Sequence, residues 1–127
     1  MRLHNTIGRQ TQQYRVSRDS SQEYLEVPAI SLDVCVTKLL LRSPSLILID
    51  VEGGEIDALR GMLATIRRHH PVIMCEVHWT GEAFKTFFDE NLNGLGYQAK
   101  TYAGRSLPIK SSRHHALLLP PHQSSRF

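Results

Sequence analysis

Residues 45–78 constrain the fold of this chain more than any other part of the sequence. They open with an uninterrupted apolar run, residues 46–49, which is typical of a strand that is covered on both faces in a parallel sheet. An acidic turn with Gly53 and Gly54 follows, and Pro71 precedes a second apolar strand over residues 72–77. Two parallel strands joined by a helix form a βαβ unit, whose strands have their carboxyl ends side by side.

The segment between these strands predicts one amphipathic helix. Apolar residues recur there with the period of an α-helix, while charged residues fall elsewhere: Ile56, Leu59, Met62, Leu63 and Ile66 against Glu55, Arg60 and Arg67. Acids crowd the start of this segment and basic residues its end, which is the order that a helix dipole favours. Pro71 is expected to end the helix, because proline cannot continue one.

The flanking segments predict further elements of the same kind. We expect a hairpin within residues 1–26, a short helix capped by Ser31 or Asp33, a helix capped by Thr80, a strand over residues 96–102, and a last strand over residues 116–119. Strands that alternate with helices predict an α/β fold with a mostly parallel sheet and helices on its faces. The expected organisation is a polar segment over residues 1–26, a domain over residues 27–120 and a disordered tail over residues 121–127.

Composition excludes several classes of protein. The chain has 127 residues, which is at most one domain, and a net charge of +3 without a basic stripe, so nucleic acid is not an expected partner. No apolar run approaches the ~20 residues that a membrane span needs, and no signal peptide is visible. Cys35 and Cys75 lie in apolar sequence and are expected to be free, buried thiols, which favours a reducing, cytoplasmic compartment.

The candidate site lies at the carboxyl ends of the two central strands. Ligands of open α/β sheets bind outside these ends. Asp50 closes the first strand and Glu52 follows it, while Glu76 and His78 close the second strand and share one face of it. Gly53 lets the backbone approach a ligand closely. These four polar side chains are therefore expected to converge on one rim.

Each of these residues also has an ordinary structural explanation. Asp50 and Glu52 would suit helix capping, Glu76 an ion pair with an arginine, and His78 an unremarkable surface position. Trp79 either walls a pocket or packs against its neighbours. Two histidine pairs, His69-His70 and His114-His115, lack a metal-ligand spacing, and the phenylalanines after Thr80 share a helical face that is typical of a core.

Five short segments together resemble one family. The sequences IDVEGGE (residues 49–55) and LRG (59–61) resemble the "IDVEGxE…LxG" signature of FkbM-type methyltransferases. The sequences VPAISLD (27–33), PVIMCEVH (71–78) and LGY (95–97) resemble the family's "VPxxSLD", "PxIxxExH" and "LGY" segments. The resemblance implies an S-adenosylmethionine-dependent O-methyltransferase with a seven-stranded Rossmann-like fold, acting on a hydroxyl of a small molecule or sugar.

The resemblance also implies roles for the rim and shows one departure. Within such a family our hypothesis is that Asp50, Glu52 and His78 serve catalysis, that Gly53, Glu76 and Trp79 contact the substrate, that Asp50 also contacts the cofactor, and that no residue binds a metal. In this family a glycine-rich DxGxxxG loop and a later acid hold S-adenosylmethionine. Nothing before Val27 resembles either of them, so we expect the chain to represent the carboxyl-terminal part of the domain, inactive by itself.

Two rival interpretations stay open at this stage. The chain could be a non-catalytic half-domain that a partner completes, since the strand over residues 46–49 would otherwise leave an open apolar edge suited to self-association. It could also be a metal-dependent hydrolase that uses Asp50, Glu52, Glu76 and His78 around Mg²⁺ or Mn²⁺. Metal assistance to methyl transfer ranks below an unassisted base, with His78 or Glu52 as the base.

Overall fold

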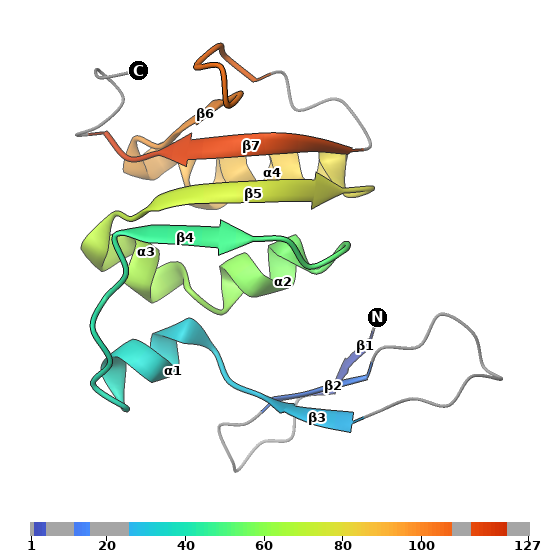
Figure 1. The fold of residues 1–127 in the computed structure, drawn as a ribbon, viewed down its shortest axis with the longest axis vertical. Coiled ribbons are helices and arrows are strands. Elements are labelled where there is room, and N and C mark those ends of the chain that lie inside the picture. Colours follow the sequence, from blue (N-terminus) through green and yellow to red (C-terminus); the bar gives the residue numbers. More distant parts are fainter. Residues whose placement is uncertain (1, 5–11, 16–25, 108–112, 122–127) are drawn as a thin grey trace, which may run out of the picture. The chain divides into compact units, whose positions relative to one another are not determined.

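The computed structural model describes residues 2–4, 12–15, 26–107 and 113–121 (Figure 1). The chain divides into two compact units, residues 1–41 and residues 42–127, and each is described by itself. In the described residues, no helix is long and apolar enough to cross a membrane. The tail predicted over residues 121–127 lies outside the described residues from position 122 onward.

The first unit is a small antiparallel sheet followed by a helix. Its strands are β1 (Arg2–His4), β2 (Gln12–Arg15) and β3 (Glu26–Ala29), in that order across the sheet. Proline cannot donate a backbone hydrogen bond, and Pro28 accordingly lies on β3, an edge strand. Helix α1 (Leu32–Thr37) is capped by Ser31, whose Oγ accepts a hydrogen bond from the backbone N–H of Val34 at 3.2 Å.

The second unit contains the central stretch. Its elements are β4 (Leu46–Ile49), α2 (Glu55–Arg60), α3 (Leu63–His69), β5 (Val72–His78), α4 (Gly81–Asn91), the 3₁₀ turn η1 (Asn93–Leu95), β6 (Gln98–Lys100) and β7 (Arg113–Leu119). The four strands form one sheet in the order β4-β5-β7-β6. The α/β fold class is therefore confirmed.

The expectation that the strands pair mostly in parallel is wrong. Only β4 and β5 pair in parallel, with Leu46 opposite Val72, whereas β7 is antiparallel to both β5 and β6. A parallel neighbour needs a long crossover, usually a helix. After β6 the N–H of Gly104 bonds to the carbonyl of Thr101 in a tight turn, and β7 lies between β5 and β6 in the sheet.

The central helix is two helices rather than one. Helix α2 ends at Arg60, and Gly61 follows as its C-cap. The N–H of Met62 bonds back only three residues, to the carbonyl of Leu59 at 3.1 Å, so the chain makes a tight turn before α3 begins. The predicted apolar face survives this break, since Leu59, Met62 and Ile66 are all buried.

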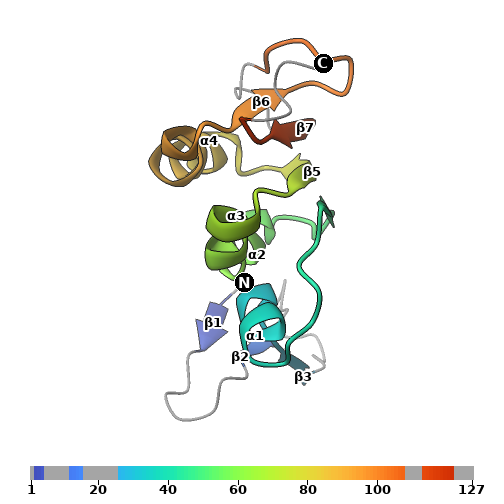
Figure 2. The ribbon, with the colours of Figure 1, turned by 90° about the vertical axis from the view of Figure 1, so that its left-hand side faces the viewer.

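Helices cover one face of the four-stranded sheet. In Figure 2, α2, α3 and α4 all lie on the same side of the strands. The residues that point to that side, Ile47 and Ile49 among them, are buried, as are the phenylalanines of α4 that were predicted as core. The other face of β4 exposes Leu46 by 57% and Leu48 by 72%. The prediction that this strand is covered on both faces is therefore wrong for the described residues.

Two smaller predictions have clear outcomes. Thr80 is the N-cap residue of α4, but its side chain makes no capping hydrogen bond, so only the position was predicted correctly. Both cysteines are free, as expected; Cys75 is buried, whereas Cys35 is only half-buried. A hydrogen bond from the hydroxyl of Tyr97 to the carbonyl of Pro71, at 2.7 Å, ties the start of β5 to the segment before β6.

Candidate functional site

A tight turn directly after β4 places the first two acids. The N–H of Gly54 bonds to the carbonyl of Val51 at 3.2 Å, and both central residues have positive φ, +48° at Glu52 and +98° at Gly53. Positive φ at both central positions is the pattern of a type I′ turn. Glycine adopts such a φ without cost, but glutamate does not, so Glu52 is held in a strained conformation at the rim of the sheet.

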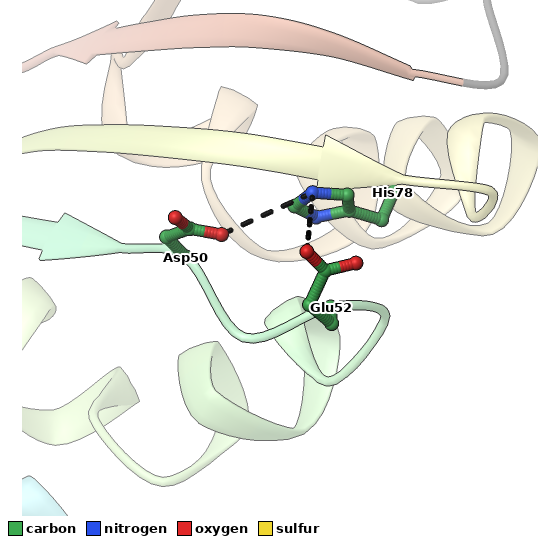
Figure 3. Close-up of side chains that lie close together, drawn as sticks. All are labelled: Asp50, Glu52 and His78. Atoms are coloured by element: carbon green, nitrogen blue, oxygen red, sulfur yellow. Dashed lines mark ion pairs between the residues drawn. The ribbon is translucent and has the colours of Figure 1, made fainter. Parts of the chain in front are cut away.

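His78 is the centre of the site. It is the last residue of β5 and its side chain is fully buried. Figure 3 shows Asp50 and Glu52 directed at its ring, with His78 Nε2 lying 3.9 Å from Asp50 Oδ1 and 3.7 Å from Glu52 Oε1. The sequence-based expectation that these side chains meet at the carboxyl ends of β4 and β5 agrees with this geometry. The alternative of a surface histidine does not.

Glu55 holds the other side of the ring, and sequence reasoning missed this. Its carboxylate is fully buried, although the period of the segment placed it on the polar face of the helix. Its Oε1 lies 2.8 Å from His78 Nδ1 and accepts a second hydrogen bond from the backbone N–H of Gly53 at 2.9 Å. The signal in the sequence was its position, directly after two glycines and at the first turn of α2.

The surroundings of His78 favour its charged form. The hydrogen bond with Glu55 raises the pKa of His78, and the negative charges of Glu52 and Glu76 act in the same direction, while burial opposes them. The site therefore stabilises positive charge at this imidazole. Any cation that reaches the same acids would experience the same attraction.

The remaining predicted residues lie around this centre. Glu76 Oε1 is 3.3 Å from His78 Nε2, and the other carboxylate oxygen of Glu76 is 3.5 Å from Nε2 of His115. Gly53 contributes its backbone N–H to Glu55. Trp79 has a positive φ of +50°, is 62% exposed, and its ring lies 5.5 Å from that of His78. Its indole is thus available at the rim.

The site combines a fixed imidazole with carboxylates that reach solvent. The side chains of Asp50 and Glu52 are 59% and 56% exposed, whereas His78 is covered behind them. One possible ligand atom from each of these three residues lies within 4.8 Å of the other two. Such a group can accept a proton from a hydroxyl, attract a cationic molecule or coordinate a metal ion.

The fold and the site together define an α/β protein with an acidic, histidine-centred rim at the carboxyl ends of two parallel strands. A family model described as the methyltransferase FkbM domain matches residues 3–102, which is most of the chain. The chain therefore belongs to the FkbM methyltransferase domain family. Comparison with curated proteins and with solved structures found no match.

The matched range includes every residue of the rim. It begins at Leu3, upstream of the position at which the sequence resemblance began, and it ends at Tyr102, before β7. Asp50, Glu52 and Glu55 lie in the turn and helix after β4, and His78 ends β5. The geometry around His78 therefore belongs to the family domain and not to an appended segment.

Proposed function

We propose that this chain takes part in S-adenosylmethionine-dependent methyl transfer to a hydroxyl of a small molecule or sugar. Membership of the FkbM methyltransferase domain family supports a methyltransferase. The observation that carries the proposal is the meeting of Asp50, Glu52 and His78 at one rim, since the acids come from the turn of the family signature. Substrate and cofactor are the inferred part.

The burial of the three side chains distinguishes their roles. An acceptor hydroxyl can reach Glu52, which is more than half exposed, without any movement of the protein. His78 is fully buried behind Glu52 and meets solvent nowhere. Of the two candidate bases, Glu52 is therefore the one that takes the proton, and His78 holds the carboxylate in place. Such a base contributes about 10²–10⁴-fold to a rate.

The positive charge of S-adenosylmethionine is complementary to the acidic rim. S-adenosylmethionine supplies a methyl group on a positively charged sulfonium. Asp50, Glu52 and Glu76 bring three carboxylates to one imidazole, which favours a cation at this place. Asp50 is exposed at the end of β4 and would accept hydrogen bonds from the cofactor, while the exposed ring of Trp79 offers a flat apolar surface beside it.

Strand directions support a Rossmann-like sheet as the finer description of the fold. β7 is antiparallel to both β5 and β6, so β6 runs in the same direction as β5. β4 is parallel to β5, which gives three strands of one direction and a single reversed strand, β7. The rim lies at the carboxyl ends of β4 and β5, which is where open α/β sheets bind their ligands.

The proposal is tested with the full chain and radiolabelled S-adenosylmethionine. Calorimetry first measures cofactor binding, and a panel of hydroxyl acceptors is then assayed for label transfer. We expect Glu52→Gln to lower the transfer rate by about 10²–10⁴-fold, because the amide cannot accept the proton. Glu90→Gln, an exposed acid on α4, is the matched control and should leave the rate unchanged.

Two results would count against the proposal. A chain that binds no S-adenosylmethionine in calorimetry lacks the proposed cofactor site at the rim, whereas absent label transfer alone agrees with the inactivity expected from the missing glycine-rich loop. A chain that transfers label equally well with Gln at position 52 uses a different base, and the assignment of Glu52 would then be withdrawn.

A further inference from the structure

The imidazole ring of His78 has one buried nitrogen whose hydrogen-bonding capacity is unused. Nε2 of His78 is buried and makes no hydrogen bond with any residue that the structure describes. Three carboxylate oxygens surround it, from Glu76 at 3.3 Å, Glu52 at 3.7 Å and Asp50 at 3.9 Å. Three acids around one nitrogen favour a positive charge there, which either a second proton on the ring or a bound cation supplies.

The hydrogen bond to Glu55 determines which ring nitrogen faces the acids. An ionised carboxylate only accepts hydrogen bonds, so Nδ1 of His78 carries the hydrogen that Glu55 binds. When the ring is neutral, its lone pair is then at Nε2, the nitrogen to which Asp50 and Glu52 are both directed (Figure 3). A carboxylate that fixes one nitrogen of a histidine while the other faces a ligand is the usual support of metal-binding histidines.

We propose that Asp50, Glu52 and His78 bind one divalent transition-metal ion, for which Mn²⁺ serves as the spectroscopic probe. Ligand atoms lie roughly 2.0–2.6 Å from such an ion, so two of them are at most about 4–5 Å apart. The three candidate ligand atoms lie within 4.8 Å of one another, and the two distances to His78 Nε2 are shorter still. Only small side-chain movements are therefore needed to close the site.

The donor set favours Mn²⁺ over Mg²⁺ and Ca²⁺. Carboxylate oxygens suit all three ions, but an imidazole nitrogen is a better ligand for a transition metal than for the other two. Glu76 Oε1 is close enough to His78 Nε2 to serve as a fourth ligand. Because Asp50 and Glu52 are exposed, further positions of the ion face solvent. Binding of the ion does not depend on methyl transfer; its use to orient an acceptor hydroxyl rests on the proposed function.

The test is a titration of the full, metal-free chain with MnCl₂. The electron paramagnetic resonance signal of the free ion is measured at each step, and its loss gives the amount of bound Mn²⁺. We expect one bound Mn²⁺ per chain, displaced poorly by Mg²⁺ and Ca²⁺. Asp50→Asn and Glu52→Gln change only exposed side chains and should each weaken binding by at least ~10-fold. Glu90→Gln, which removes an equal charge from the surface of α4, should bind as the unchanged chain does.

A second readout separates this site from diffuse binding to surface acids. Electron spin echo modulation should show a ¹⁴N coupling from the imidazole of His78, and His78→Gln should abolish it. Absence of bound Mn²⁺ at millimolar concentration, absence of the ¹⁴N coupling, or equal affinity in Glu52→Gln and Glu90→Gln would each overturn the proposal.

Activity measured with a chelator distinguishes the metal site from the proposed function. If the chain binds Mn²⁺ but transfers no label, the metal site is supported and methyl transfer by this chain is not. If the chain binds no Mn²⁺ and transfers label at an undiminished rate in the presence of a chelator, the metal site is refuted. Glu52 then acts as a base without a metal ion.

Discussion

Replacement of Glu55 by glutamine tests whether its buried carboxylate holds the site together. Oε1 of Glu55 accepts two hydrogen bonds, from Gly53 N at 2.9 Å and from the ring of His78 at 2.8 Å. Glutamine keeps the shape and one accepting oxygen but removes the charge. Hydrogen bonds to charged groups contribute roughly 1.5–3 kcal/mol and neutral ones roughly 0.5–1.5 kcal/mol. With two bonds weakened, we expect Glu55→Gln to lower the free energy of unfolding by about 2 kcal/mol.

Urea denaturation of the full chain measures this loss. Circular dichroism reports on the helices, and Trp79, the single tryptophan of the sequence, reports on the neighbourhood of His78 by fluorescence. In a heating experiment, 1 kcal/mol corresponds to roughly 4–8 °C for a unit of about 60–100 residues, such as the one over residues 42–127. Glu55→Ala leaves no acceptor at all and should cost more, about 3–5 kcal/mol, as expected when one partner of a buried pair is removed.

The matched control is Glu90→Gln, which makes the same chemical change at an exposed position of α4. Substitutions of this kind usually change stability by less than about 0.5 kcal/mol. If Glu55→Gln and Glu90→Gln unfold at the same urea concentration, the carboxylate of Glu55 does not hold the ring of His78, and the argument from its burial is refuted.

Three further outcomes follow from the described geometry. Glu52→Gly relieves a left-handed conformation that costs a non-glycine residue about 1–2 kcal/mol, while the added glycine costs about 0.5–1 kcal/mol in chain entropy. We therefore expect unchanged or higher stability in urea, together with loss of Mn²⁺ binding. A marked destabilisation would contradict this. Burial and the nearby charges of Glu55 and Asp50 raise the pKa of Cys75 to about 12. At pH 8 this thiol should therefore react with a disulfide reagent far more slowly than the half-buried Cys35. Equal reaction rates of the two thiols would be inconsistent with that. Leu48→Thr keeps strand propensity but removes an exposed apolar side chain, so light scattering should detect less self-association; an unchanged mass distribution would exclude this face.

The sequence predicted the arrangement of the rim residues better than it predicted the sheet. The approach of Asp50 and Glu52 to His78 follows from one rule, that the carboxyl ends of consecutive parallel strands lie side by side. Each element of that βαβ unit carries its own local pattern of apolar residues. The positions of these residues were therefore predictable from short stretches of sequence.

What failed depended on distant parts of the chain. The period of α2 places charged residues on the solvent side, but Glu55 is buried because an imidazole 23 positions later supplies its hydrogen bond. The apolar run of β4 indicated two covered faces, yet the described helices of the unit cover only one. The reversed direction of β7 depends on which strands it joins, and no local pattern of residues encodes that choice.

The terminal position of β4 has a consequence for whatever binds there. Among the strands that the structure describes, β5 alone pairs with β4, so the backbone groups on the outer side of β4 are open to another polypeptide. A segment that lengthened the sheet in parallel at this margin would finish directly beside Asp50. The side chains of such an added strand would then form one wall of the rim. The same acids and histidine would bind different molecules depending on which polypeptide supplies that strand.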